Sequence, residues 1–324
     1  MNRVLNIVSD DDVIKVMRRA NIPGSFLSWR DFLYRGAVPE SLSLEALSKV
    51  RAKYIASQGF DSYEKAYREL QERNSTLHAF RKYDRILLWF EHDLCNQLQL
   101  IQILDWFAKY SLDASPISII YPDKHLLICS PEKLKKMMIY NRESISDSQF
   151  LVARQAWSAF RAPTPVAWSK LLYDDTSSLP FLRDAVLRML EEYPNTINGL
   201  SKTAHQALLI IANGIHKPYE IFEAYQQQEK RRFMRDAIFF NILKDLLSHN
   251  VLSSSHNGEY LEITAIGDRV LKAEQNWLNL IDVDFWLGGV HLTSQNIWCW
   301  DIAKQKIVTD LNISPFCRGF RKSY

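Results

Sequence analysis

Apolar runs of strand length alternate with helical patterns over the first part of the chain. The run at residues 84–90 (D-R-I-L-L-W-F) is the clearest, because a continuous apolar stretch such as the one that ends it suits a central strand covered on both faces. Residues 3–8 form a similar run, and apolar side chains follow at helical spacing over 12–20. This alternation predicts an open α/β sheet, mostly parallel and Rossmann-like, over residues 1–130. The other elements expected there are strands 25–29 and 117–121, helices 42–58, 62–82 and 97–110, and an irregular loop at 30–39.

Helical patterns replace this alternation from residue 131 onward. We expect an all-helical region over 131–195. In 196–292, three helical segments precede two short strands, which is the order of a winged helix-turn-helix. Residues 293–324 are predicted to hold a hairpin and a tail. The segments are helices 131–138, 147–160, 164–173, 179–193, 201–213, 219–228, 233–248 and 264–272, and strands 251–254 and 259–263 around a turn at 256–258.

Composition excludes several classes of protein. Apolar residues make up 47% of the chain, with only ten Gly and eleven Pro, so a mostly disordered or fibrous chain is excluded. A length of 324 residues favours two or three domains. The net charge is +3, from 40 basic against 37 acidic residues, which is far weaker than the basic excess of a protein that coats nucleic acid.

The length of the apolar segments and the spacing of the cysteines indicate where in the cell the protein is expected. No apolar stretch reaches the roughly 18 to 20 residues of a membrane span, and the start does not resemble a signal peptide. The four cysteines form no C-x-x-C pair, so neither a zinc ribbon nor a disulfide scaffold is indicated. We therefore expect a soluble cytoplasmic protein with reduced thiols, although a specialised bacterial secretion signal is not readable from the sequence.

A polar cluster follows the strongest predicted strand. Glu91, His92 and Asp93 come directly after residue 90, and Gln97 lies one helical turn further on. In an open α/β sheet, ligands bind outside the carboxyl ends of the strands, which is where this cluster is expected to lie. A carboxylate beside an imidazole can act as a general acid–base pair or bind a divalent metal. The alternative is structural, since Asp93 could cap the helix that follows.

A second acidic cluster follows the first strand. Asp10, Asp11 and Asp12 stand where such folds often bind phosphate, but glycine is absent, and three carboxylates repel a phosphate unless a divalent cation bridges them. This turn is therefore either a metal-assisted site or a strongly capped helix start. Arg30 and Asp31 follow the second strand. Neither a dinucleotide-binding G-x-G-x-x-G nor a P-loop motif occurs in the chain.

The predicted winged helix contains candidate nucleic-acid contacts. Basic residues cluster before and along its third helix, where a recognition helix would contact DNA. Asp236 and Asp245 dilute this charge, and winged helices also serve as protein-interaction modules. The candidates are Arg231, Arg232, Arg235 and Lys244.

A Gly288-Gly289 pair permits a tight turn shortly before His291. His291 could reach a ligand site, but a single histidine is more often structural.

Several unusual motifs occur together in one order. They resemble the bacterial domain-of-unknown-function family 1835, and the resemblance extends to about Leu292. It implies an α/β N-terminal domain and a C-terminal winged-helix-like region, and it implies no established activity. The motifs are I-P-G-S-F-L-S-W-R-D-F-L-Y-R-G-A-V-P at 22–39, L-L-W-F-E-H-D-L-C-N-Q-L-Q-L at 87–100, F-R-A-P at 160–163, N-G-L-S-K-T at 198–203 and W-L-G-G-V-H-L at 286–292.

The family carries a Gly-Asp-Ser triplet after the first strand, and only Asp11 of residues 10–12 matches it. The resemblance therefore does not support a backbone phosphate cradle at this turn. The segment after Leu292, including the basic residues 318–322, matches nothing in the family. The positions that do match are Arg30, Asp31, Gly36, Glu91, His92, Asp93 and Gln97.

These observations favour an enzyme-like site at the carboxyl edge of the sheet, with hydrolysis or group transfer on a phosphate-containing small molecule as the expected reaction. The alternatives are a ligand-sensing regulator that binds DNA and a protein-interaction scaffold. The cofactor is not identified by the sequence, and a divalent metal is compatible with it. The predicted roles are carboxylate catalysis by Asp11, Asp31, Glu91 and Asp93, acid or base catalysis by His92, pairing of Arg30 with an anionic group, and substrate contact by Gln97 and His291.

Overall fold

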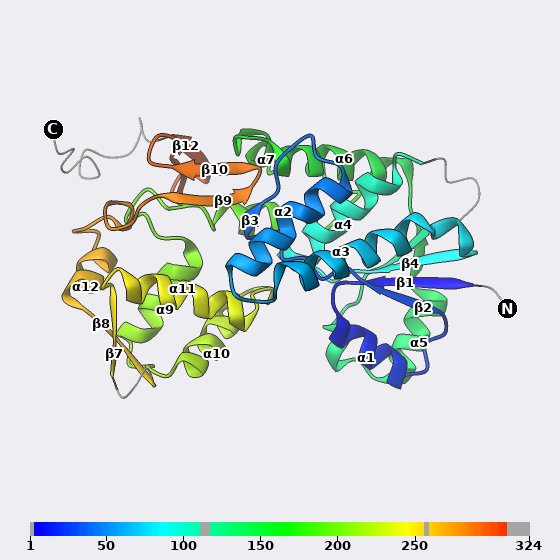
Figure 1. Cartoon of the computed structure of the whole chain (residues 1–324), viewed down its shortest axis with the longest axis horizontal. Coiled ribbons are helices and arrows are strands. Elements are labelled where there is room, and N and C mark those ends of the chain that lie inside the picture. The colour runs from blue at the N-terminus through cyan, green and yellow to red at the C-terminus, as the bar shows by residue number, and fades with distance from the viewer. Residues whose placement is uncertain (1–2, 111–116, 256–258, 310–324) are drawn as a thin grey trace. The chain divides into compact units, whose positions relative to one another are not determined.

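The computed structural model describes residues 3–110, 117–255 and 259–309. The chain divides into two compact units, one of residues 1–186 with 288–290 and one of 187–287 with 291–324 (Figure 1). Residues 131–186 thus belong to the first unit. The predicted turn at 256–258, Cys317 and the basic residues 318–322 lie outside the described residues.

The first unit is built on a mixed, mostly parallel sheet with the strand order β2-β1-β4-β5-β6. Every residue of β1 is buried, and so is every residue of β5, as expected for strands covered on both faces. The predicted parallel sheet is confirmed for four strands. These are β1 (Val4–Val8), β2 (Ser25–Ser28), β4 (Arg85–Trp89) and β5 (Ile117–Ile120), and the fifth strand is β6 (Arg142–Ser144).

The edge strand β6 corrects the expectation of an all-helical region after residue 131. It pairs antiparallel with β5, and its three residues are exposed. Its sequence, Arg-Glu-Ser, shows no apolar pattern. Backbone hydrogen bonds to β5, and not burial of its side chains, hold β6 in the sheet, so the strand needs no apolar residues. A second correction concerns the loop expected at 30–39, which contains the short strand β3 (Gly36–Ala37).

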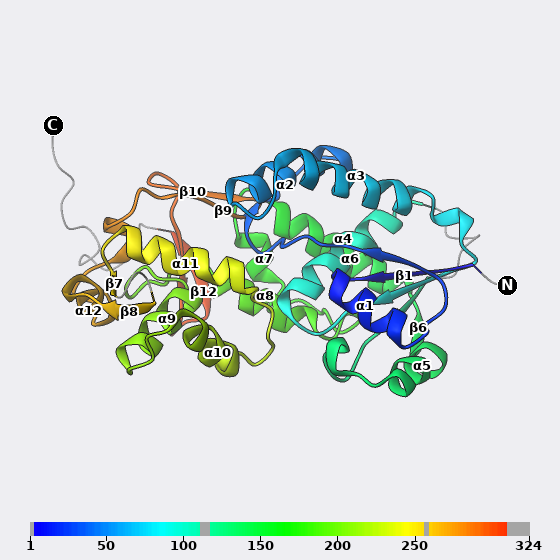
Figure 2. The same cartoon turned by 60° about the horizontal axis from the view of Figure 1, so that its bottom comes forward.

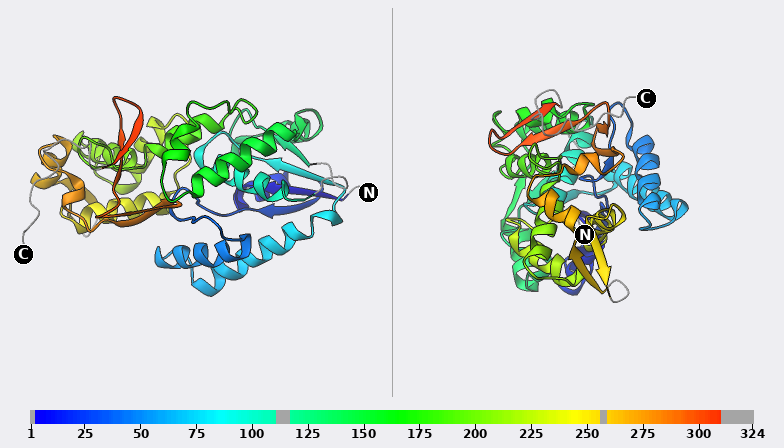
Figure 3. Two further views of the ribbon diagram at one scale, coloured as in Figure 1. Left: turned by 90° about the horizontal axis from the view of Figure 1, so that it is seen from above. Right: turned by 90° about the vertical axis from the view of Figure 1, so that its left-hand side faces the viewer.

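Helices cover both faces of the sheet. Val13 and Met17 of α1 join Leu134 of α5 in a core with β1 and β4, and Figure 2 shows α1 and α5 on the same side of the sheet. On the other face, α4 is buried along almost its entire length and packs against α6. The pair α2 and α3 runs side by side (Figure 3). The bounds are α1 (Asp11–Arg19), α2 (Leu44–Ser57), α3 (Tyr63–His78), α4 (Leu94–Phe107), α5 (Pro131–Tyr140), α6 (Asp147–Arg161) and α7 (Val166–Lys170), with short 3-10 helices η1 (Phe80–Lys82) and η2 (Leu126–Ile128).

Side-chain caps fix where these helices begin. Asp10 accepts hydrogen bonds from the backbone N–H groups of Asp12 and Val13 at the start of α1. Asp93 accepts one from the N–H of Asn96 at the start of α4. Both carboxylates satisfy amides that have no partner inside the helix and favour the positive end of the helix dipole. The structural alternative for the two acidic clusters is therefore confirmed for Asp10 and Asp93.

The Gly288-Gly289 pair lets two backbones approach closely within the first unit. The Gly289 N–H donates to the Phe160 carbonyl at 2.9 Å, and a Cβ built on Gly289 would lie 1.9 Å from the Arg161 carbonyl oxygen. Gly288 also has a φ of 60°, in the left-handed region that glycine tolerates. Glycine is required here by close approach as well as by the turn.

The second unit combines helices with small antiparallel sheets. Helices α9, α10 and α11 precede the hairpin β7–β8, and Trp298 and Trp300 lie in a second hairpin, β11–β12. The bounds are α9 (Lys202–Ala212), α10 (Pro218–Gln228), α11 (Asp236–Ser248), β7 (Leu252–Ser255), β8 (Tyr260–Ile263), α12 (Ala265–Leu271), η4 (Trp277–Asn279), β9 (Asp284–Gly288), β10 (Val290–Thr293), β11 (Trp298–Asp301) and β12 (Lys306–Thr309). Helix α8 (Leu182–Leu190) runs across the division between the units.

Two general properties follow from the described residues. None of their helices combines the length and the apolar character that crossing a bilayer requires. Cys95, Cys129 and Cys299 are buried, and no disulfide joins any of these three.

Candidate active site

Three side chains occupy equivalent positions at the carboxyl edge of the sheet. Val8 pairs with Ser28 on one side and with Trp89 on the other. Asp10, Arg30 and Glu91 each lie two residues beyond these paired positions. The chain leaves β1 toward β2 on one side and later returns to β4 on the other, so the strand order reverses between β1 and β4. Ligands of open α/β sheets bind at such a switch point.

Among the carboxyl groups at this edge, Glu91 has the pKa that departs most from its ordinary value. Its side chain is only 11% exposed, its Oε1 accepts the Leu126 N–H at 2.8 Å, and the same oxygen lies 3.5 Å from Nδ1 of His125. The pKa of Glu91 is raised to about 8, mainly by burial and in part by the nearby carboxylates of Asp93 and Asp10, while the Leu126 hydrogen bond opposes the shift. Glu91 is therefore mostly protonated at neutral pH.

Two of the predicted site residues, Gln97 and Asp93, form hydrogen bonds that position the backbone of Glu91. The Gln97 side chain donates from Nε2 to the Glu91 carbonyl at 2.7 Å. Asp93 accepts hydrogen bonds from the Asn96 backbone and side chain, and the Asn96 Oδ1 in turn accepts the Glu91 N–H at 3.0 Å. Burial raises the pKa of Asp93 to about 6, although the Asn96 hydrogen bonds oppose this shift. Together these contacts fix the backbone from which the Glu91 side chain extends.

His92 is held by aromatic stacking. Its ring lies 3.6 Å from the Phe181 ring, with 18° between their planes, and Phe181 also contacts Tyr121 edge-on at 5.3 Å. The stacking orients the imidazole against an aromatic face. Stacking thus fixes the orientation of the His92 ring, which is predicted to act as an acid or base. The imidazole that contacts the Glu91 carboxyl group, however, is that of His125.

Arg30 bridges two helices through carboxylates. Its guanidinium lies 2.7 Å from Asp11 on α1 and 3.0 Å from Glu69 on α3. The backbone of Arg30 has a φ of 53°, a left-handed conformation that is strained for an arginine. Two carboxylates thus already neutralise this cation, so an anionic ligand would have to compete with both.

Asp31 turns into the interior instead of the sheet edge. Its side chain is 1% exposed and pairs with the equally buried Arg51 at 2.9 Å. Arg51 also donates to the carbonyls of Phe32 and Arg35, and Gln99 donates to the carbonyl of Asp31. These bonds tie the loop after β2 to α2 and α4. The expectation that Asp31 acts with Glu91 does not fit this placement.

Backbone amides at this edge already bind carboxylates of the chain itself. Asp10 occupies the first amides of α1, Asp93 those of α4, and Glu91 the first amide of η2. Phosphate binds to amides of this kind in folds that recognise nucleotides. Within the described part of the chain, no three His, Cys, Asp or Glu side chains are placed to hold a metal ion. The site is therefore built around a single protonated carboxyl group and its neighbours.

Sequence reasoning missed His125, Glu69 and the Leu126 amide. The sequence could have indicated His125. It follows β5, which lies parallel to β4 in the sheet, so both strands end at the carboxyl edge where Glu91 lies. Glu69 gives no such signal, since only the packing of α3 brings it to Arg30.

His291 lies in the second unit and has partners there. Its Nε2 is 2.6 Å from Oδ1 of Asp284, and its ring stacks on Trp286 at 4.5 Å with 7° between the planes. Its carbonyl accepts a hydrogen bond from Asn296. The structural alternative for His291 is thus supported by three contacts within the strands around it.

The four basic candidates for nucleic-acid contact differ in their surroundings. Arg232 donates to the Gln226 carbonyl at 3.2 Å, Arg231 and Arg235 are partly buried, and Lys244 is exposed on α11. Asp236 and Asp245 are exposed on the same helix. The candidates therefore do not form one uniformly basic face.

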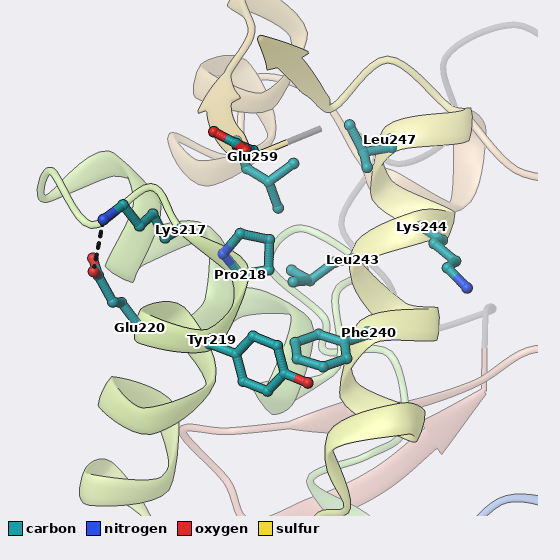
Figure 4. Close-up of a pocket in the computed structure, with 10 residues that line it drawn as sticks. Lys217, Pro218, Tyr219, Glu220, Phe240, Leu243, Lys244, Leu247 and Glu259 are labelled. Carbon is teal, nitrogen blue, oxygen red and sulfur yellow. Dashed lines mark ion pairs between the residues drawn. The ribbon is translucent and has the colours of Figure 1, made fainter. Parts of the chain in front are cut away.

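Next to Lys244, the surface between α10, α11 and β8 is apolar. A pocket of about 820 Å³ opens there, and Figure 4 shows the Tyr219 and Phe240 rings next to each other on one side of it, with Leu243 close to Phe240 and Leu247 further along the same helix. The Tyr219 and Phe240 rings meet edge-on at 5.0 Å. Lys217 and Glu220 form an ion pair at one side of the pocket, as the dashed line in Figure 4 marks. A surface of this kind differs from the basic face that duplex DNA requires.

Comparison with protein-family models finds no match to this chain, and a search of curated proteins finds no similar sequence. The resemblance to family 1835 therefore stays a prediction that rests on the motifs alone.

Proposed function

We propose that the protein is an enzyme that uses Glu91 as a general acid at the switch point of the sheet. The observation that supports this most is the pKa of about 8 of a carboxyl group held beside an imidazole where the strand order reverses. A carboxylic acid that keeps its proton at neutral pH can donate it to a substrate, whereas an ordinary glutamate cannot.

The neighbours of Glu91 account for both halves of a proton transfer. After Glu91 gives its proton to a substrate oxygen or nitrogen, the Leu126 N–H stabilises the resulting carboxylate. The Nδ1 of His125, which is 45% exposed, lies 3.5 Å from Glu91 and accepts the Leu127 N–H at 3.4 Å, so it can return a proton from solvent to Glu91 once that hydrogen bond is released. The buried arrangement of Asp93 and Gln97 keeps Glu91 in position through both steps.

The charge around Glu91 favours a neutral or cationic substrate. Asp10 and Asp93 flank it, and Arg30 is neutralised by Asp11 and Glu69. We therefore propose hydrolysis or group transfer on a small molecule with an oxygen or nitrogen leaving group. A phosphate group is not part of this proposal, because the amides suited to it already bind carboxylates.

An untargeted substrate search tests this function. Wild-type protein and the Glu91→Gln variant are incubated with a bacterial metabolite extract, and mass spectrometry follows which compounds are consumed. Exposed Glu64→Gln serves as the matched control, since it makes the same chemical change on the surface of α3. We expect a compound that wild type and the control consume and Glu91→Gln does not, with a rate that falls as pH rises through about 8. Equal consumption by Glu91→Gln, or none by wild type, contradicts the proposal.

We also infer that α9, α10, α11, β7, β8 and α12 form a winged-helix unit, because three helices followed by an antiparallel hairpin occur in the expected order. The alternative function, a regulator that binds DNA through this unit, predicts duplex binding that weakens with salt and with Arg231→Ala plus Arg235→Ala. The mixed charge of α11 favours the enzyme over this alternative. A protein inactive in both assays would instead fit the interaction scaffold.

A further inference from the structure

A second, smaller cavity lies in the second unit, between the start of α9 and the β11–β12 hairpin. Its volume is about 310 Å³, at the lower end of the range for small-molecule sites. Trp300, Leu271, Ile197 and Ile302 supply its apolar wall. We call it the Trp300 cavity.

Hydrogen bonds hold the wall of the Trp300 cavity in one shape. The Asn195 Oδ1 accepts the N–H groups of Ile197 and Asn198, and its Nδ2 donates to the Asn198 side chain and the Leu200 carbonyl. The Trp300 N–H donates to the Pro194 carbonyl at 2.8 Å, and the Thr196 N–H donates to the Trp300 carbonyl at 3.1 Å. A ligand would therefore enter a preformed space and would not have to order a loop.

The cavity also carries one positive and one negative charge. Lys202 Nζ lies 2.7 Å from Oε2 of Glu191, and these side chains are 38% and 22% exposed. A pair this accessible to solvent contributes little to stability, so a ligand that offers a carboxylate to Lys202 and a cation to Glu191 can take up both charges at small cost.

Two neutral polar groups complete the lining. Burial lowers the pKa of His205 below its ordinary value, which keeps its imidazole uncharged at neutral pH. The Gln206 Oε1 is buried and accepts no hydrogen bond from any residue in the described part of the chain. A ligand N–H that reached this oxygen would satisfy it, which adds a second reason to expect a donor on the ligand.

We propose that the Trp300 cavity binds a free apolar α-amino acid. The α-carboxylate pairs with Lys202, the α-ammonium pairs with Glu191 and donates to Gln206, and the apolar side chain packs on Trp300 and Leu271. The balanced charges select a zwitterion over a simple acid or amine, because each of those would leave one charge of the pair without its ligand partner. This site belongs to the second unit, and its occupation does not depend on the function of Glu91.

Calorimetric titration of the full chain tests the assignment. The ligands are leucine, phenylalanine, isoamylamine, which lacks the carboxylate, and isocaproate, which lacks the ammonium. We expect both amino acids to bind at one site, and leucine to bind about tenfold or more tightly than either analogue, since each loses a hydrogen-bonded charge pair. In Lys202→Met, leucine should bind no more tightly than isoamylamine. In Glu191→Gln, leucine should bind no more tightly than isocaproate.

Two further variants separate loss of the site from loss of the fold. Ile302→Asp puts a charge on a half-exposed residue of the wall and should abolish leucine binding without lowering the melting temperature of the unliganded protein. Leu209→Ala changes an exposed apolar residue of α9 outside the wall and should bind leucine as wild type does. No binding of either amino acid, analogues that bind as tightly as leucine, or binding that persists in Ile302→Asp each overturns the proposal.

Discussion

The raised pKa of Glu91 predicts an unusual dependence of stability on pH. Below about pH 4.5, the ordinary value of its pKa, the carboxyl group is protonated in both the folded and the unfolded chain. Between that value and about 8, the unfolded chain has lost this proton and the folded chain still holds it. The free energy of unfolding therefore falls as pH rises through this window and levels off above it.

The magnitude follows from the two pKa values. Each pH unit between them changes the free energy of unfolding by about 1.4 kcal/mol, so the contribution of Glu91 differs by roughly 5 kcal/mol between the acid and the alkaline limits. This is a large share of the roughly 5–15 kcal/mol that stabilises a typical domain. Asp93, with its pKa raised to about 6, adds a decline of the same sign at lower pH.

Glu91→Gln isolates the contribution of one group. Glutamine has a similar shape and keeps an Oε1 to accept the Leu126 N–H, but it cannot lose a proton. The variant should therefore be close to wild type near pH 5 and more stable than wild type by several kcal/mol near pH 9. Urea unfolding at intervals between these limits, followed by a signal from the first unit, measures this difference directly.

The control is again Glu64→Gln, whose exposed carboxyl group makes the same change in net charge. A decline with pH that wild type and Glu64→Gln share and Glu91→Gln lacks is then assigned to Glu91. A flat difference between wild type and Glu91→Gln across the same range, or a difference of opposite sign, would refute a raised pKa at Glu91 and with it the general-acid role.

Three further predictions concern residues that fix the site and the first unit. Asp93→Ala should lower the free energy of unfolding by about 0.5–2 kcal/mol through loss of the α4 cap, whereas Asp93→Asn should lose less because it can still accept the Asn96 N–H; urea unfolding compares the two variants. Arg51→Met should cost about 3–5 kcal/mol by leaving Asp31 charged and buried, and the double variant Arg51→Met, Asp31→Leu should recover part of that loss in the same measurement. Gly289→Ala should destabilise the first unit by about 1–3 kcal/mol, because its Cβ would meet the Arg161 carbonyl, and a melting temperature equal to that of wild type would count against this contact.

Local sequence pattern determined most of the elements around the site. The mainly apolar runs at 3–8 and 84–90 became β1 and β4, because strands covered on both faces take apolar side chains at most positions. Asp10 and Asp93 became helix caps, as short polar side chains before helical patterns do. Placement of Glu91 at the carboxyl edge followed from these elements and from the rule that parallel strands end together.

Only the tertiary structure decided which of the polar residues meet. Asp31 and Arg30 are neighbours in sequence, yet one pairs with Arg51 in the interior and the other with Asp11 and Glu69 near the surface, because the backbone at Arg30 is left-handed. The position of β6 likewise depends on backbone hydrogen bonds to β5, which leave no mark on its side chains.

The contact between His125 and Glu91 joins residues far apart in the chain, and so does the cavity that brings Trp300 to the Lys202–Glu191 pair. The sequence alone thus determined which groups lie at the ends of the elements. The packing of those elements determined burial, and burial in turn decided which carboxyl group keeps its proton.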